Sequence, residues 1–226
     1  MNRDVIPTKD GSLTIYVPEM NATYHSIHGA ILESQHVYIN SGLLYTLEKF
    51  YRDSPLFVLE MGFGTGLNAL LTLIESENTK RNIHYTSIEL FPLQADEINV
   101  LNYCQLLNRP GLIPIFNMIH ECEWEKEISI TPYFTLLKRK CSLLDYNTEL
   151  QYNIIYFDAF DPSVQPELWT AEIFARIYSI LSPGAVLVTY CSKGDVRRII
   201  IKTDFTVEKL AGPPGKREIT RAIKYT

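Results

Sequence analysis

The feature that most constrains the fold of this chain is a glycine-rich segment, GFGTG at residues 62–66, set between two apolar patterns. The run LFVLE, residues 56–60, has the content of a buried strand, and LNALLTLIESE, residues 67–77, has helical spacing. Glycine lets the backbone turn sharply and lets a ligand approach the main-chain donors at the start of a helix. The segment therefore predicts a strand–loop–helix unit that binds a ligand at its loop.

The spacing of these glycines argues against two common nucleotide-binding loops. A dinucleotide fingerprint would place its third glycine at position 67, where this chain has Leu67. A P-loop would end in Gly-Lys-Ser/Thr, and residues 66–68 are Gly-Leu-Asn. The pattern therefore disfavours NAD, FAD and P-loop triphosphate binding.

The chain after residue 80 continues to alternate strand patterns with helix patterns. The expected strands are residues 56–60, 83–89, 133–144, 153–158 and 184–191, and the expected helices are residues 67–77, 95–104, 167–181 and 192–201. FTVEKLA and KREITRAI flank GPPG and predict an antiparallel hairpin. We therefore expect an α/β, Rossmann-like fold with a seven-stranded, mostly parallel sheet and an antiparallel C-terminal hairpin.

Two regions lie outside this alternation. Residues 13–17 and 36–39 have the content of short strands in an N-terminal extension over residues 1–54. Residues 110–132 carry three prolines and the acidic stretch ECEWEKE, and they suggest an insertion or a mobile, acidic cover. We expect one domain over residues 1–226, with its core at residues 55–226.

Three carboxylates follow the expected strands: Glu89, Asp145 and Asp158. The carboxyl ends of parallel strands meet at one edge of a doubly wound sheet, so these side chains are expected to converge. Glu89 is placed to accept both hydroxyls of a ribose, and Asp145 to accept from an adenine amino group. Together with the glycine loop they favour S-adenosylmethionine as the ligand.

The distribution of charge bears on the partner. The net charge of −5 excludes a uniformly basic nucleic-acid coat, but residues 193–226 hold nine basic and four acidic residues, or +5, on a body of −10. The four cysteines lack metal-ligand spacing and are expected to be reduced. The chain begins without the apolar run of a signal peptide, and no stretch approaches eighteen apolar residues, so we expect a cytoplasmic protein without a membrane partner.

Six segments between about residue 24 and residue 223 form a specific combination: YHSIHGAILESQHVYIN, LEMGFGTGLNAL, SIELFPL, DAFDPSVQPELWT, SKGDVRR and GPPGKREITRA. This combination resembles the amino-terminal methyltransferase domain of the bifunctional tRNA enzyme MnmC and its stand-alone counterpart MnmD. The resemblance implies methyl transfer from S-adenosylmethionine to the aminomethyl nitrogen of 5-aminomethyl-2-thiouridine at the tRNA wobble position. The product is 5-methylaminomethyl-2-thiouridine.

The resemblance also implies roles for residues. Asp158 matches the catalytic aspartate, which we expect to orient the amine and take its proton. The cofactor-binding positions are Glu60, Gly62, Gly64, Gly66, Asn68, Glu89 and Asp145. By residue type alone, Tyr24 and Phe160 are either stacking partners for the uridine or ordinary aromatics of the core or a loop. Because of the positive charge of the C-terminal segment, we expect several of its basic residues to contact phosphates of the anticodon stem-loop; the candidates are Lys193, Arg197, Arg198, Lys216, Arg217 and Arg221.

The resemblance covers the methyltransferase half of MnmC, and residues 1–226 show no segment that resembles its oxidoreductase half. We therefore expect another enzyme to supply the aminomethyl group, with functional coupling to that enzyme and to a separate oxidoreductase. The alternatives are an N-methyltransferase acting on a small-molecule amine and a non-catalytic RNA-binding module of the same fold. The cluster His25, His28 and His36 lacks a fourth ligand, so no metal site is predicted.

Overall fold

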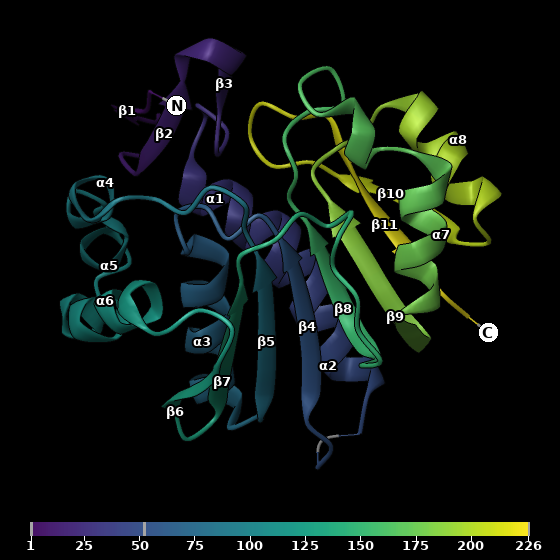
Figure 1. Ribbon diagram of the computed structural model, residues 1–226, viewed down its shortest axis with the longest axis horizontal. Coiled ribbons are helices and arrows are strands. Elements are labelled where there is room, and N and C mark those ends of the chain that lie inside the picture. The colour runs from purple at the N-terminus through teal and green to yellow at the C-terminus, as the bar shows by residue number, and fades with distance from the viewer. Residues whose placement is uncertain (1, 52, 226) are drawn as a thin grey trace.

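The computed structural model describes residues 2–51 and 53–225, so both ends of the predicted domain, residues 1 and 226, lie outside the described residues. Its centre is an eight-stranded sheet (Figure 1). In order across the sheet the strands are β10 (Thr206–Ala211), β11 (Glu218–Ile223), β9 (Leu181–Thr189), β8 (Tyr152–Phe157), β4 (Leu56–Met61), β5 (Ile83–Ile88), β7 (Phe134–Arg139) and β6 (Glu127–Thr131). The five strands from β9 to β7 are parallel, and β6, β11 and β10 pair antiparallel.

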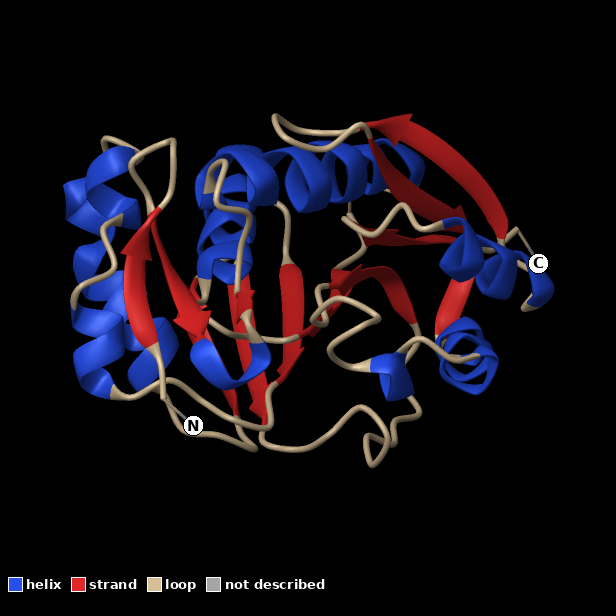
Figure 2. Ribbon diagram, turned by 90° about the horizontal axis from the view of Figure 1, so that it is seen from above, coloured by secondary structure: helices blue, strands red, loops and turns tan. Residues whose placement is uncertain are grey.

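Helices cover both faces of the sheet, as the view from above shows (Figure 2). One face carries α1 (Ala30–Ser34), η2 (Gln35–Leu44), α2 (Tyr45–Lys49), α3 (Leu67–Thr79) and α6 (Ile113–Glu121). The other carries α7 (Ala171–Ser179) and α8 (Gly194–Lys202). The fold therefore has three layers, with the carboxyl ends of the parallel strands gathered at one edge.

The central strands are apolar throughout because both of their faces are covered. In β8, Ile154 and Tyr156 pack in the cluster under α3, whereas Ile155 and Phe157 pack in the cluster under α7. Successive side chains of a strand point to opposite faces, so an uninterrupted apolar run supplies both cores. This explains why uninterrupted apolar segments of the sequence predict the central strands.

The predicted Rossmann-like α/β class, with a mostly parallel sheet and a C-terminal hairpin, is confirmed. The expected number of seven strands is wrong, because residues 127–131 form β6 beside β7. The stretch EISIT alternates polar and apolar residues, and Ile130 is buried. The region expected to be an acidic cover thus contains η3 (Pro110–Leu112), α6 and β6.

Two further local predictions are wrong. Residues 36–39 belong to the π-helix η2 and not to a strand. In place of the single helix expected over residues 95–104, the chain forms two short helices, α4 (Ala95–Asn99) and α5 (Tyr103–Leu106). Residues 13–17 do form a strand, β2 (Leu13–Val17).

The N-terminal residues form a small sheet above the carboxyl ends of β4 and β5 (Figure 1). It consists of β1 (Asp4–Pro7), β2 and β3 (Ala22–Thr23), with the turn η1 (Pro18–Met20) between the last two. The guanidinium of Arg3 donates to the carbonyl oxygens of Phe91 and Pro92 at 2.5 and 3.2 Å and pairs with Glu97. These contacts hold the small sheet over the edge where the site lies.

Within residues 2–51 and 53–225, no helix combines the length and hydrophobicity needed to cross a bilayer.

Candidate active site

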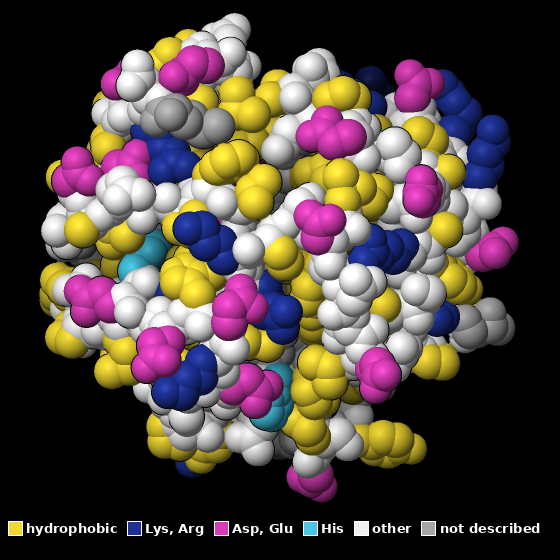
Figure 3. Space-filling view, viewed as in Figure 1, with side chains coloured by type: hydrophobic (Ala, Val, Ile, Leu, Met, Phe, Trp, Pro, Cys, Tyr) yellow, Lys and Arg dark blue, Asp and Glu magenta, His cyan; other side chains and the backbone are white. Residues whose placement is uncertain are grey.

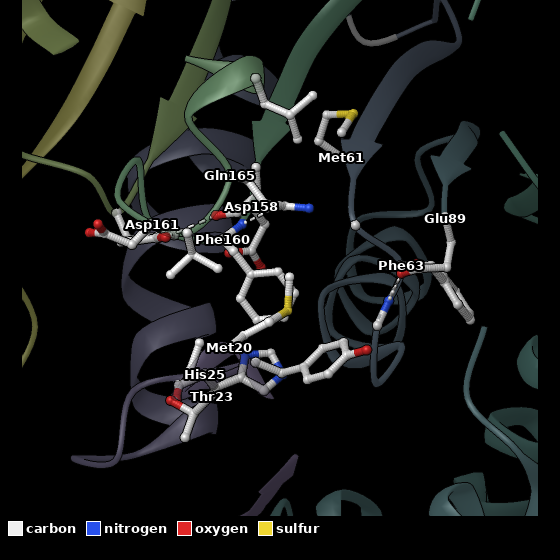
Figure 4. A pocket seen from close by; sticks show the side chains of 18 of the residues that line it. Met20, Thr23, His25, Met61, Phe63, Glu89, Asp158, Phe160, Asp161 and Gln165 are labelled. Atoms are coloured by element: carbon white, nitrogen blue, oxygen red, sulfur yellow. Dashed lines mark hydrogen bonds between the residues drawn. The ribbon is translucent and has the colours of Figure 1, made fainter. Parts of the chain in front are cut away.

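A cavity of about 900 Å³ lies at the carboxyl ends of β4, β5 and β8. The turn η1, the glycine loop after β4, the end of β5 and the loop after β8 all contribute lining residues (Figure 4). Ligand pockets typically occupy ~300–1,000 Å³, so this cavity has room for a large ligand. It lies where doubly wound sheets bind their ligands.

The glycine loop is held in a conformation that side chains resist. Gly62, Gly64 and Gly66 have φ angles of 88°, 48° and 69°. A Cβ atom on Gly64 would lie 2.8 Å from the ring of Tyr24, so that position has no room for a side chain. The loop leads directly into α3 at Leu67, and the N–H groups of its three glycines donate to the Ile88 carbonyl, to Glu89 and to the Phe63 carbonyl.

Glu89, after β5, connects the glycine loop to the next segment. Its Oε2 accepts from the backbone N–H of Gly64 at 3.0 Å, and its Oε1 accepts from the N–H of Phe91 at 2.8 Å. A carboxylate has about four acceptor positions, so two remain for hydroxyl groups of a ligand. Glu89 lies across the cavity from Asp158 (Figure 4).

Asp158, after β8, is held by two side chains. Tyr38 donates its hydroxyl to Oδ1 at 2.5 Å, and Asn68 donates its amide to Oδ2 at 2.9 Å. Burial raises the pKa of Asp158 to about 7, against the lowering effect of these hydrogen bonds. A carboxylate that titrates near neutrality is suited to general-base catalysis at that pH.

Three more side chains surround Asp158 in the cavity. Glu33, which is 6% exposed, pairs through Oε1 with the Nζ of Lys216 at 2.5 Å. That ammonium also lies 3.8 Å from the ring centre of Tyr190, whose hydroxyl donates to the Ala159 carbonyl at 2.8 Å. This part of the cavity is therefore acidic and contains one cation that is already paired.

Two aromatic rings form one wall of the cavity. Tyr24 and Phe160 meet edge to face with 5.2 Å between ring centres. The Phe160 backbone is fixed on both sides, since its N–H donates to Gln165 Oε1 and its carbonyl accepts from Trp169 Nε1. Figure 4 shows Phe160 and Asp158 projecting from the same loop. A planar ligand at this wall would meet a fixed aromatic surface.

The structure places the predicted site residues unevenly. Those that line the cavity are Gly62, Gly64, Asn68, Glu89, Asp158, Tyr24, Phe160 and Lys216. Gly66 lies behind the loop, where a Cβ atom would meet His120 at 2.8 Å. The Glu60 side chain is buried below the cavity and accepts from Ser87 at 2.6 Å, and burial raises its pKa to about 8. Glu60 therefore supports the site from beneath.

The expectation that Asp145 ends a strand at the cavity is wrong. β7 ends at Arg139, and Asp145 is exposed in the segment that follows. The residues of that segment that line the cavity are 141–144. Asp145 directly follows this lining segment, and its contact with an adenine amino group stays a prediction.

The basic residues divide into buried and exposed members. The guanidinium of Arg197 is buried and donates to Thr220 Oγ1, to Glu218 and to the Ile219 carbonyl, at 3.0, 2.6 and 3.0 Å. Its prediction as a phosphate ligand is corrected, because these three bonds commit it to holding β11 against α8. Arg198 pairs with Asp195 on the exposed face of α8.

The remaining basic residues lie on different parts of the molecule. Lys193 pairs with Asp161 at 2.5 Å beside the cavity, and Arg217 is exposed. Arg221 pairs with Glu208 at 2.7 Å and lies over the Tyr45 ring. Figure 3 shows Lys and Arg side chains gathered over α8.

The three clustered histidines have separate partners. His25 Nε2 lies 2.7 Å from Thr65 Oγ1, His36 Nε2 lies 2.7 Å from the Ala211 carbonyl, and His28 packs against Gly215. Among residues 2–51 and 53–225 no group of three potential metal ligands is found. Burial lowers the pKa of His25 to about 4, so its ring is neutral at physiological pH.

Sequence reasoning missed Tyr38, Glu33 and Tyr190 as residues of this site. The first two lie in the segment YHSIHGAILESQHVYIN, which contributed only to the overall resemblance. The available signal was an aromatic and an acidic residue in a segment that matched a methyltransferase. Nothing in their spacing pointed to contact with Asp158, since 120 positions separate Tyr38 from that residue.

Comparison with known proteins gives three findings. Residues 114–225 match the model of a family described as S-adenosyl-L-methionine-dependent methyltransferase. That range contains Asp158 and the C-terminal hairpin, while the glycine loop precedes it. The predicted enzyme class therefore has support independent of the loop.

Named relatives are similar over most of the chain. The protein called tRNA 5-methylaminomethyl-2-thiouridine biosynthesis bifunctional protein MnmC of Paraburkholderia xenovorans (strain LB400) is 26% identical over 220 residues, which cover 90% of this chain and 32% of that protein. The protein of the same name from Aeromonas hydrophila subsp. hydrophila is 26% identical over 217 residues, which cover 89% and 32%. The resemblance to MnmC is confirmed, and this chain spans about a third of the length of these relatives.

Solved structures agree on the fold. The crystal structure of MNMC2 from Aquifex aeolicus superposes with a TM-score of 0.78 at 20% identity, covering 98% of this chain and 69% of that one. Spermidine synthase from Thermotoga maritima superposes with a TM-score of 0.56 at 14% identity, covering 98% and 68%.

Proposed function

We propose that this chain transfers a methyl group from S-adenosylmethionine to the aminomethyl nitrogen of 5-aminomethyl-2-thiouridine at the wobble position of tRNA. The observation that carries the proposal is Asp158, a carboxylate with a pKa of about 7 that faces the same cavity as the glycine loop and Glu89. The similarity to proteins named for 5-methylaminomethyl-2-thiouridine biosynthesis supports the choice of substrate.

The residues present fit the cofactor. Gly62 and Gly64 line the cavity beside Glu89, which keeps acceptor positions for two ribose hydroxyls. When bound, S-adenosylmethionine supplies a methyl group on a sulfonium, which the amine nitrogen takes with its lone pair while the electron pair of the carbon–sulfur bond stays on sulfur.

Asp158 prepares the amine for this transfer. An alkylammonium has no lone pair, so one proton must leave the nitrogen before the carbon–nitrogen bond forms. Asp158 accepts that proton on a carboxylate oxygen and orients the neutral amine through the resulting hydrogen bond. General-base help of this kind contributes ~10²–10⁴-fold to the rate. The cavity favours a cationic substrate over an anionic one, because the carboxylates among the described residues that line it outnumber the one lysine, Lys216, that is paired with Glu33.

Other residues of the cavity suit a nucleotide. Tyr24 and Phe160 form a wall against which a splayed-out uridine stacks, as single-stranded RNA bases commonly do on aromatic side chains. Arg198, Arg217 and Lys193 are exposed on the basic C-terminal part, which suits contact with phosphates of the anticodon stem-loop. Because the body is acidic, we expect few phosphate contacts.

The test is to incubate the protein with labelled S-adenosylmethionine and tRNA that lacks the final methyl group, and then to identify the labelled nucleoside by mass. Label in 5-methylaminomethyl-2-thiouridine is the expected result. Label on the free nucleoside but not on tRNA would favour an enzyme for small amines. Failure to bind S-adenosylmethionine in calorimetry would favour a non-catalytic RNA-binding module.

A further inference from the structure

Tyr38 lies in η2, which packs directly on the sheet. The Tyr38 side chain is 1% exposed, and its ring centre lies 5.3 Å from that of Tyr156. Gly42, four residues later, is so close to β8 and β9 that a Cβ atom would come within 2.9 Å of Ile154 and Val188. The position of η2 against the sheet is therefore fixed, and with it the depth of the tyrosine.

The conformation of η2 is itself unusual. It is a π-helix of ten residues, whereas π-helices are rare and mostly appear as single turns, frequently at functional sites. This helix places the Tyr38 hydroxyl 2.5 Å from Asp158 Oδ1. The N-terminal part of the chain thus reaches the carboxylate that the end of β8 provides.

The carboxylate of Asp158 has one protein donor on each oxygen. Tyr38 on η2 donates a hydrogen bond to Oδ1, and Asn68 on α3 donates one to Oδ2. Hydrogen bonds to the charged form of an acid favour that form. Two donors leave about two acceptor positions, so a substrate amine still has a place to bind.

The charges around Asp158 mostly oppose its ionisation. The titratable and charged groups that face it are Glu33 on α1, Tyr38 on η2, Glu60 on β4, Tyr85 on β5, Tyr190 after β9 and Lys216 before β11. Burial is the largest cause of the raised pKa of Asp158, and the hydrogen bond from Tyr38 is the largest cause that lowers it. Burial also holds the pKa of Tyr38 well above its ordinary value, so this hydroxyl keeps its proton and donates throughout the physiological range.

We propose that Tyr38 is a positioning residue for the methyl transfer, whose hydroxyl fixes the orientation of the Asp158 carboxylate and keeps it in the ionised form that accepts the proton of the amine. This inference rests on the proposed function and adds to it a residue from the N-terminal segment. Tyr38 acts through Asp158 and does not take part in bond making. Removal of the Tyr38 hydroxyl is therefore expected to shift the pH range in which Asp158 accepts a proton, more than to lower the maximal turnover.

The test is the pH profile of turnover for the full chain and for Tyr38→Phe. Loss of a hydrogen bond to a charged group corresponds to about one unit of pKa. The acid limb of the variant should move up by about one pH unit, so that turnover falls about fivefold at pH 7, approaches a tenfold loss at lower pH and recovers at alkaline pH. The free substrate amine titrates identically in both experiments, so a difference between the pH profiles of kcat/KM comes from the enzyme.

Tyr156→Phe is the matched control, because this buried tyrosine touches the Tyr38 ring while its hydroxyl lies 3.2 Å from Thr72. Its acid limb should not move. A Tyr38→Phe protein with an unmoved limb, whether turnover is normal or evenly reduced, would overturn the inference. If Tyr38→Phe does not fold, 3-fluorotyrosine at position 38 keeps the packing and makes a stronger donor. The limb should then move to lower pH, and an unmoved limb would again overturn the inference.

A second readout needs no activity. Carbon-13 NMR of aspartate carboxyls gives the titration of Asp158, identified as the resonance missing from Asp158→Asn. Its midpoint should rise by about one unit in Tyr38→Phe and stay in place in Tyr156→Phe. If the wild-type chain fails to methylate tRNA, the proposed function fails, but this titration still decides whether Tyr38 controls the carboxylate.

Discussion

Asp158 and Glu89 end two strands of one sheet, on either side of β4, and they are held in different ways. Asp158 receives its hydrogen bonds from the side chains of Tyr38 and Asn68. Glu89 receives its hydrogen bonds from the backbone N–H groups of Gly64 and Phe91. Burial raises the pKa of Asp158 to about 7. Under the proposed function, the Glu89 side of the cavity holds the cofactor and the Asp158 side moves a proton; these are called the holding side and the proton-moving side below.

The difference shows how a fold shared by many enzymes acquires a reaction. Backbone donors come with the strand–loop–helix turn, and they fix Glu89 whatever the neighbouring side chains are. Side-chain donors depend on particular residues brought from distant segments. Tyr38 comes from the N-terminal extension, so the proton-moving side includes residues from outside the alternating strand–helix part. Function here resides in the site more than in the fold.

The largest expected effect comes from removing the base. Asp158→Asn keeps the size of the side chain and one of its two acceptor oxygens but takes no proton, so turnover should fall by ~10²–10⁴-fold. Cofactor affinity should stay within a few-fold, because the holding side is untouched. Single-turnover kinetics and calorimetry measure the two quantities. Near-normal turnover of Asp158→Asn would show that Asp158 is not the base, and the assigned difference between Asp158 and Glu89 would be wrong.

The next effect concerns the holding side. Glu89→Gln loses a charged acceptor for two hydroxyls, so the Kd for S-adenosylmethionine should rise by ~10–100-fold. Turnover at saturating cofactor should change little, since Asp158 is intact. Glu167→Gln, another carboxylate lining the cavity, serves as the control in the same calorimetric titration. An unchanged Kd in Glu89→Gln would show that Glu89 does not hold the cofactor.

The pH dependence of the wild-type protein follows from the raised pKa of Asp158. The base must be ionised, and protonation below a pKa of about 7 removes it, so turnover should fall about tenfold for each pH unit well below that value. The residual activity of Asp158→Asn should lack this component. A wild-type profile that stays flat down to pH 5 would mean that no group of this kind controls the rate.

The smallest effect separates charge from hydrogen bonding on the proton-moving side. Lys216→Met removes a cation that favours ionised Asp158, and it leaves Glu33 without its partner. Both changes raise the pKa of Asp158, so the acid limb should move up by a fraction of a pH unit. Lys209→Met, at an exposed position of β10, should leave the limb in place. A downward shift in Lys216→Met would contradict the assigned role of this lysine.

The sequence predicted the holding side better than the proton-moving side. Gly62, Gly64 and Glu89 lie within one strand–loop–helix unit and the next strand, where spacing along the chain translates into proximity. Asp158 was found because an apolar strand ends at it. Its partner Tyr38 was read as part of a strand, since HVYI has β-branched and aromatic residues, and only packing of η2 on the sheet makes that segment helical.

Two other errors have the same origin in tertiary structure. Asp145 was placed at a strand end, but β7 stops six residues earlier at Arg139, and boundaries of this kind are set by pairing with β5. Arg197 and Arg198 are adjacent in a basic motif, yet one is buried against Glu218 and the other is exposed. Charge alone did not distinguish them, because the distinction depends on which face of α8 meets β11.

The most direct test of the central claim compares wild-type protein with Asp158→Asn on tRNA that carries 5-aminomethyl-2-thiouridine, with S-adenosylmethionine at saturation. The nucleosides are separated, and their masses are measured by mass spectrometry. The account predicts that the wild-type protein makes the wobble nucleoside one methyl group heavier, while Asp158→Asn binds the cofactor normally and leaves the nucleoside almost unchanged. An unmodified wobble nucleoside with the wild-type protein, or equal conversion by both proteins, would contradict it.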